Sequence, residues 1–457
     1  MSPSVYLVAS LAMLLGGAST PNARPEQQGH QPAARTESEV FERARHSVFV
    51  VETESGHGSG FLVDVRGLII TNDHVVGRAS YLAVGVNPSR KYPAVVVARD
   101  PSRDLALIRI HARAVEGLEP LRFNDFAAGV KVGERVVAIG SALSQAGSVL
   151  TTGIVSRLEA DTLVADLNVN SGSSGGPLLN LNGEVVGLCT FFVKAPAGPG
   201  LAGIVRAHVA RPILAAAAAS LPPESPPFEA LPVPSPIPYP ADALREKAAG
   251  IRSPGAYGTT VRGMRIDALT PPIVYFEAHQ TEIRQAKQNA EAGGRGAAGE
   301  PFRNRYAWQA YTGHVEAIIG VRAVPDVIDL TDNGIDEEVE VRRTTPSAIG
   351  RRVRFTGDVR KIQLLRNGVE VVPIVPGRFC RNAADASPRQ PAGCFGLYQY
   401  APSAFAPGAE LELRVHSDDA PTRPRVWKIP ASVVSRVWAD FAPWLAVAAC
   451  PAPCAMR

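Results

Sequence analysis

A short turn rich in glycine and serine holds a candidate nucleophile. Residues 170–177 read NSGSSGGP and lead into the apolar pair Leu178–Leu179. A serine that attacks an acyl group needs a tight, exposed turn whose backbone N–H groups converge on the developing oxyanion, and glycines permit both the dihedral angles and the close approach. The N–H groups of Gly172 and Ser174 are the natural donors. A Gly/Ser-rich hairpin loop without chemistry explains the same residues, so the turn alone decides little.

A serine hydroxyl also needs a base within hydrogen-bond reach and a group that orients this base. His74 follows the apolar run Leu68–Thr71, at a strand end that can hold a side chain rigidly. Asp104 precedes the apolar run Leu105–Ile108, which can bury its carboxylate beside an imidazole. A lone histidine in such a place is more often a polar loop residue. Only the three segments together indicate an active site.

Taken together, these segments resemble the HtrA/Deg family of trypsin-like serine proteases over about Val48 to Ser220. The resemblance rests on ordered motifs: GSGFLV at 58–63, TNDHVV at 71–76, DLALI at 104–108, GSSGGPLL at 172–179 and NGEVVG at 182–187. It implies a double β-barrel with the active site between the barrels, and it implies His74 as base, Asp104 as orienting residue and Ser174 as nucleophile. Gly172 and Ser174 then supply the oxyanion hole.

Three neighbouring residues compete for these roles. Ser173 adjoins Ser174, but only Ser174 directly precedes Gly-Gly-Pro as in the family. His57 lies in a Gly-rich turn before a strand and is expected to face solvent. Asp100 lies close to Asp104, but Asp104 directly abuts the Leu-Ala-Leu strand, as the family's aspartate does.

Two departures from the family concern specificity and regulation. Ser171 and Ser173 replace the usual Pro and Asn before the nucleophile, which changes side chains and not the backbone donors. Asn168, six residues before the nucleophile, is expected to help floor the substrate pocket, and without an acidic residue there we predict a small or medium uncharged side chain before the scissile bond. No PDZ-like Gly-Leu-Gly loop is recognised after Pro240.

The elements that must position these residues read as short strands. Many β-rich runs separated by Gly, Pro and Asn turns favour antiparallel barrels over alternating β-α units. The first group of six runs is 48–52, 60–65, 68–71, 82–86, 94–97 and 105–110, and the second is 135–139, 149–158, 163–166, 177–179, 185–192 and 203–205. The predicted fold class is therefore mainly β, with two six-stranded antiparallel barrels and a C-terminal β-rich α+β domain of unknown fold.

The chain divides by composition into five segments. We predict a signal peptide at 1–18, a disordered tether at 19–35, the protease domain at 36–221, a Pro-rich linker at 222–240 and the C-terminal domain at 241–457. Within these segments, Thr36 and Glu39 have the form of a capping box, and the alanine-rich stretch before Ser220 reads as a helix. Residues 276–292 and 431–445 also read as helices.

The composition excludes some function classes and favours an exported protein. Lys and Arg number 47 against 43 Asp and Glu, without a basic block, which argues against nucleic acid as a partner. No stretch is long and apolar enough for a stable membrane span. Four cysteines, Cys380, Cys394, Cys450 and Cys454, can form two disulfides in an order that the sequence does not give. Cys189, inside an apolar run, is expected to be a buried inert thiol.

No metal or other cofactor is predicted. Residues 329–340 space their oxygen-bearing side chains as an EF-hand loop does, but their flanks do not read as paired helices and Asp-Asn-Gly is also an ordinary turn signal.

These features predict an exported serine endopeptidase, periplasmic or extracellular, that cleaves unfolded or exposed protein segments. Family analogy adds a possible homotrimer. The alternative is a catalytically silent protein that keeps the protease fold and binds through its C-terminal domain. All three functional groups are present, which favours the enzyme.

Overall fold

The computed structural model describes residues 35–124, 129–140, 148–169, 172–190, 201–221, 225–277, 315–329, 353–382 and 391–449. The predicted signal peptide, nearly all of the tether, the EF-hand-like segment after Asp329, and Cys450 and Cys454 lie outside these residues. Residues 278–292 of the predicted helix 276–292 also lie outside them. Its first two residues are described and are helical.

A capped helix leads into the first sheet, as the sequence predicts. Helix α1 (Glu37–Ala44) begins after Thr36, whose side chain accepts from the Glu39 N–H while the Glu39 carboxylate accepts from the Thr36 N–H. These reciprocal bonds satisfy two N–H groups that a helix start otherwise leaves unpaired. Val40 and Ala44 are buried in the core between the two N-terminal sheets and fix the helix there.

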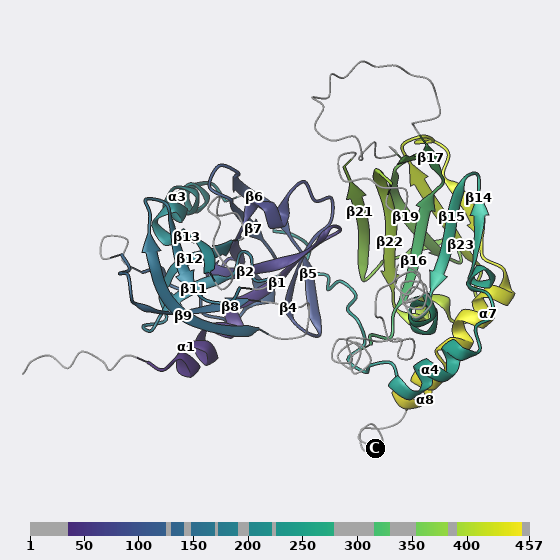
Figure 1. Ribbon diagram of the computed structural model, residues 1–457, viewed down its shortest axis with the longest axis horizontal. Coiled ribbons are helices and arrows are strands. Elements are labelled where there is room, and N and C mark those ends of the chain that lie inside the picture. The colour runs from purple at the N-terminus through teal and green to yellow at the C-terminus, as the bar shows by residue number, and fades with distance from the viewer. Residues whose placement is uncertain are drawn as a thin grey trace, which may run out of the picture. The chain divides into compact units, whose positions relative to one another are not determined.

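The first sheet contains seven antiparallel strands in the order β5-β4-β1-β2-β3-β7-β6 (Figure 1). Their bounds are β1 (Val48–Thr53), β2 (Gly56–Asp64), β3 (Leu68–Thr71), β4 (Leu82–Asn87), β5 (Arg90–Pro93), β6 (Val95–Asp100) and β7 (Leu105–Arg109). Six of these correspond to predicted strands. The sequence did not predict β5, which folds back on β4 through a turn in which Asn87 Oδ1 accepts from the Ser89 N–H at 2.9 Å. Among the described residues, the two end strands β5 and β6 do not pair with each other, so this sheet is open.

The second sheet is a closed barrel in the order β10-β13-β12-β11-β8-β9. Its strands are β8 (Arg135–Gly140), β9 (Val149–Leu158), β10 (Thr162–Asp166), β11 (Pro177–Asn180), β12 (Val185–Thr190) and β13 (Leu201–Arg206), followed by helix α3 (Arg211–Ser220). All six strands and the helix were predicted. The predicted mainly β class is confirmed.

Apolar side chains form a core in each of these two sheets and a third core where they meet. The third core joins Phe61, Ile70 and Leu107 of the first sheet to Ile139 and Leu188 of the second. Strands that are apolar on both faces bury one face inside their own sheet and the other against the partner sheet. The ends of β3, β7 and β12 therefore come together at this junction.

The C-terminal domain is a two-sheet β structure with helices. Its five-stranded sheet has the order β14-β15-β16-β22-β21 (Figure 1). Its four-stranded sheet has the order β20-β19-β23-β24, and side chains of both sheets form one core. The strands are β14 (Gly258–Val261), β15 (Met264–Leu269), β16 (Ile319–Pro325), β19 (Val359–Arg366), β20 (Val369–Val371), β21 (Val375–Arg381), β22 (Gly393–Tyr400), β23 (Leu411–Ser417) and β24 (Arg425–Lys428). Two short strands, β17 (Val327–Asp329) and β18 (Val353–Phe355), pair with each other in a separate two-stranded sheet.

The described part of this domain also contains the helices α4 (Ala241–Ala249), α7 (Ala431–Asp440) and α8 (Ala442–Ala448) and a helical stretch at 271–277. The predicted single helix 431–445 is divided at Phe441, whose side chain is fully buried. A disulfide joins Cys380 of β21 to Cys394 of β22. Among the described residues, no helix has the length and apolarity of a membrane span.

Part of the predicted linker packs on the first sheet. The Leu231 N–H donates to the Lys91 carbonyl of β5, and the Phe228 ring stacks on Tyr92 with centroids 5.4 Å apart. The Arg113 guanidinium lies over the Phe228 ring, 4.7 Å from its centroid. These contacts hold this stretch of the linker to the N-terminal domain.

Candidate active site

The candidate nucleophile lies on a glycine turn that directly precedes β11. Gly172 and Gly175 have φ angles of 95° and 85°, in the region that favours glycine. A Cβ on Gly175 would lie 2.1 Å from the Ser59 carbonyl oxygen and 2.3 Å from Thr71 Oγ1. The glycine at 175 is therefore required by both its backbone angle and its close neighbours, and Ser174 is held at the start of a buried strand.

Hydrogen bonds from both sheets hold the backbone of this turn. The Ser59 N–H of β2 donates to the Ser174 carbonyl at 2.7 Å. On the other side, the Gly175 N–H donates to the Cys189 carbonyl at 2.8 Å, and the Cys189 N–H donates to the Gly176 carbonyl at 2.9 Å. The turn is thus fixed at the junction of the two sheets.

His74 is on a one-turn helix, α2 (Asp73–Val76), that follows β3 directly. Its Nδ1 lies 2.9 Å from Oδ1 and 2.8 Å from Oδ2 of Asp104, and its backbone N–H donates to Oδ1 at 3.0 Å. With Nδ1–H as the donor to the carboxylate, Nε2 keeps the lone pair that a general base uses. The two residues thus lie within hydrogen-bonding distance of each other, and their catalytic roles stay a prediction.

The Asp104 carboxylate is stabilised in its charged form. Burial by itself raises its pKa, but hydrogen bonds from the His74 ring, the His74 N–H and the Thr190 hydroxyl outweigh burial and lower the pKa below 3.8. The Thr190 hydroxyl donates to Oδ2 at 2.8 Å. Asp104 also has a φ of 56°, an uncommon backbone angle that Asp tolerates better than most residues.

Close backbone contacts bring α2 beside the serine turn. A Cβ on Gly58 would meet the Val75 side chain at 2.6 Å and the Ser174 carbonyl oxygen at 3.0 Å. A Cβ on Gly175 would lie 3.1 Å from the Asn72 backbone nitrogen. Val75 and the Ser174 carbonyl therefore both lie close to Gly58, and Asn72 lies close to Gly175, so neither glycine has space for a side chain.

Two further contacts hold α2 in place. Asn72 donates from Nδ2 to the Asp104 carbonyl at 2.9 Å. The buried Asp73 carboxylate forms a two-bond ion pair with Arg99 of β6, with N–O distances of 2.5 and 2.9 Å. Sequence reasoning missed Arg99 and Thr190, because each meets its partner only through the sheet pairing.

The competing residues have other partners. Asp100 accepts from Ser102 and Arg103 within the turn between β6 and β7. His57 is on β2, paired across the ladder with Glu52 of β1, and it is half-buried with a buried Nε2, so the expectation that it faces solvent is wrong. Ser173 is half-buried, and its carbonyl accepts from the Gly176 N–H at 3.0 Å.

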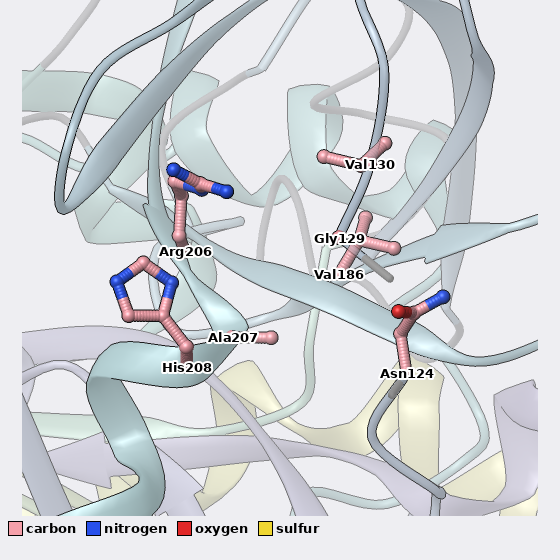
Figure 2. A pocket seen from close by; sticks show the side chains of 7 residues that line it. All are labelled: Asn124, Gly129, Val130, Val186, Arg206, Ala207 and His208. Carbon is pink, nitrogen blue, oxygen red and sulfur yellow. The ribbon is translucent and has the colours of Figure 1, made fainter. Parts of the chain in front are cut away.

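Asn168, predicted to floor the substrate pocket, is exposed just after β10. It does not line the pocket drawn in Figure 2, which has Arg206 and His208 on one side and Asn124 on the other, with Val130, Val186, Gly129 and Ala207 completing the wall. The role of Asn168 therefore stays a prediction.

Cys189 is fully buried behind the turn, and burial raises the pKa of its thiol to about 12. The thiol is therefore protonated at neutral pH, and a thiolate is the reactive form of cysteine. This agrees with the predicted inert thiol.

Comparison with known proteins identifies the same part of the chain. Residues 58–188 match the trypsin-like peptidase domain family. Over 151 residues the chain is 39% identical to the periplasmic serine endoprotease DegP of Salmonella typhimurium, which covers 31% of each chain. Over 159 residues it is 40% identical to the serine protease HTRA1 of Xenopus laevis, which covers 32% of this chain and 34% of the relative. The chain thus spans about a third of the length of these relatives.

Solved structures are also similar over part of the chain. The serine endoprotease from Yersinia pestis has 28% sequence identity and a TM-score of 0.36, covering 40% of this chain and 66% of the other. The HtrA-type protease AlgW with a tripeptide has 25% identity and the same TM-score, covering 40% and 63%.

Proposed function

We propose, from the premise that residues 58–188 form a trypsin-like peptidase domain, that this protein is a serine endopeptidase with Ser174, His74 and Asp104 as its catalytic residues. The observation that carries the proposal is the His74–Asp104 pair, with Nδ1–O distances of 2.8 and 2.9 Å, on a helix packed against the Ser174 turn. Acyl transfer by a serine requires an imidazole that is oriented by a carboxylate and lies beside the turn that carries the serine.

The proposed reaction has two stages. Ser174 Oγ attacks the peptide carbonyl while His74 Nε2 takes the hydroxyl proton, and the N–H groups of Gly172 and Ser174 stabilise the oxyanion. His74 then gives its proton to the leaving amine, and an acyl-enzyme remains on Ser174. Water, deprotonated by His74, attacks this ester, and the Ser174 oxygen leaves as His74 returns the proton to it, which releases the new carboxylate. Asp104 stays ionised throughout and stabilises the imidazolium.

We further propose that the enzyme is exported and acts on unfolded or exposed protein segments. Relatives named periplasmic serine endoproteases match the protease domain, and the Cys380–Cys394 disulfide is typical of an oxidising compartment. The proposed preference for an uncharged residue before the scissile bond rests on Asn168. A homotrimer is proposed by family analogy alone.

Labelling with a fluorophosphonate tests the nucleophile. The full-length wild type is expected to form a covalent adduct that mass spectrometry places on Ser174, and Ser174→Ala is expected to remain unlabelled. Ser173→Ala is the matched control, because it removes the adjacent hydroxyl and should leave labelling in place. Equal labelling of wild type and Ser174→Ala contradicts the assignment.

A further inference from the structure

Ser59 lies in the middle of the contacts that shape the serine turn, yet it belongs to the first sheet. It is on β2, and its exposure is 0%. A buried hydroxyl is normally hydrogen-bonded, because burying it without a partner is unfavourable. The identity of its partner therefore indicates what the side chain does.

The Ser59 side chain and backbone both bind the turn. Its Oγ donates to the Gly172 carbonyl at 2.7 Å, and its N–H donates to the Ser174 carbonyl at 2.7 Å. Its own carbonyl accepts from Thr71 Oγ1 at 2.6 Å. One residue thus connects β3 to the carbonyl groups of both residues whose N–H groups form the proposed oxyanion hole.

These contacts matter because peptide groups are planar and a glycine rotates easily. The carbonyl of a residue and the N–H of the next residue point in opposite directions. Gly172 has a φ of 95°, and a glycine can exchange such an angle for another at little cost. The Ser59 hydroxyl fixes the carbonyl side of Gly172, while the Gly176 N–H fixes the Ser173 carbonyl and, through that peptide plane, the Ser174 N–H.

We propose that Ser59 is a positioning residue that fixes the peptide planes on both sides of the Ser173–Ser174 peptide, and so keeps the backbone of Ser174, with its N–H, in the orientation that binds the oxyanion. Donors that are already oriented stabilise the transition state without reorganisation during the reaction. Ser59 itself does not touch the substrate. This inference rests on the proposed protease function and adds to it a role for the serine of the Gly-Ser-Gly motif.

A second buried serine provides a matched control. Ser47 is 2% exposed in the same domain, and its Oγ donates to the Glu119 carbonyl at 2.6 Å. Ser47→Ala and Ser59→Ala therefore remove the same chemical interaction, a buried hydroxyl bound to a backbone carbonyl. Only Ser59 is bound to the serine turn.

The experiment measures kcat, KM and melting temperature of the full-length wild type and both variants on one fluorogenic peptide. It also measures inhibition by a peptidyl trifluoromethyl ketone, which adds to a serine hydroxyl and forms an oxyanion. For Ser59→Ala we expect kcat to fall by about 10-fold to 100-fold, KM to stay within about 3-fold, and affinity for the ketone to fall in parallel with kcat/KM. For Ser47→Ala we expect kcat and ketone affinity within about 3-fold of wild type.

Equal losses of kcat in the two variants would overturn the proposal, as would a loss confined to KM. If Ser59→Ala does not fold, Ser59→Cys decides by the same readouts, because a thiol is a weaker donor and predicts an intermediate kcat. Failure of the proposed function has a separate signature: the wild type itself is then not labelled by a fluorophosphonate, and the role of Ser59 falls with it.

Discussion

At the scale of single residues, Asp104 combines a proposed catalytic role with an unusual backbone angle. Its carboxylate accepts three hydrogen bonds, from the ring and N–H of His74 and from Thr190, at a φ of 56°. Asn tolerates this region nearly as well as Asp, whereas an alanine Cβ is disfavoured there. The two substitutions therefore separate the chemistry of Asp104 from its conformation.

We predict that Asp104→Asn keeps the fold and lowers kcat by about 10⁴-fold, because an amide favours the wrong imidazole tautomer. Asp104→Ala should lower kcat at least as much and should also cost about 1–2 kcal/mol of stability from backbone strain. Steady-state kinetics and urea unfolding measure the two effects. An Asp104→Asn variant with near wild-type kcat would contradict the proposed orienting role.

The pH dependence of the rate is also a residue-scale property. A pKa below 3.8 keeps Asp104 ionised from neutral pH down to about pH 4. Because the base must be neutral to accept the serine proton, we predict that kcat/KM falls on acidification while Asp104 is still ionised. A kcat/KM profile that stays flat from neutral pH to about pH 4 would count against His74 as the base.

At the scale of elements, α2 is too short to keep its position through its own hydrogen bonds. One helical turn is marginal without external contacts, and Asn72 and the Asp73–Arg99 ion pair supply them. Asp73 is buried, so loss of its partner leaves a carboxylate unpaired in the domain.

We predict that Arg99→Gln lowers the free energy of unfolding by about 1–2 kcal/mol and lowers kcat by displacing His74. The expected loss of stability is this small because the Arg99 side chain is 34% exposed and water screens the ion pair. The double variant Asp73→Asn/Arg99→Gln should recover part of both losses, since it removes the unpaired charge. A double-mutant cycle by urea unfolding and kinetics measures the coupling. Strict additivity of the two single changes would argue that the pair does not hold α2.

Most of the protease elements could be predicted because their signals are local. The Thr36 capping box and the apolar runs of β3 and β7 depend only on neighbouring residues in the sequence. Strand β5 was missed because it carries Arg90 and Lys91 and has no apolar run. The division between α7 and α8 was missed because burial of Phe441 continues the apolar period across the break.

At the scale of the whole molecule, the C-terminal domain contains an acidic group in its core. The Asp440 carboxylate of α7 accepts from Thr270 Oγ1 at 2.6 Å and from the Tyr257 hydroxyl at 3.2 Å. Burial raises its pKa above 3.8 despite these bonds and the nearby charges of Lys247 and Arg436. The folded domain therefore binds this proton more tightly than the unfolded chain.

This sign predicts a stability gain at low pH. The contribution of Asp440 should be complete below its unfolded pKa and should disappear as the pH rises through its folded pKa. Relative to Asp440→Asn, the wild type should gain stability as the pH falls from 7 toward 4, by no more than about 1.4 kcal/mol per pH unit. Melting temperatures of the two proteins across this range test the prediction. A pH-independent difference would contradict it.

The sequence by itself indicated the candidate catalytic residues and the β-rich class of the protein. Ser174, His74 and Asp104 stand out because each sits in a short motif next to an apolar strand, and both signals are local. Only the tertiary structure decided which residues support them. Ser59 lies 115 residues from Ser174, whose turn it binds. Thr190 lies 86 residues from Asp104, and Arg99 lies 26 residues from Asp73, the carboxylates to which they donate. Such partners meet through strand register and packing between two sheets, which sequence spacing does not encode.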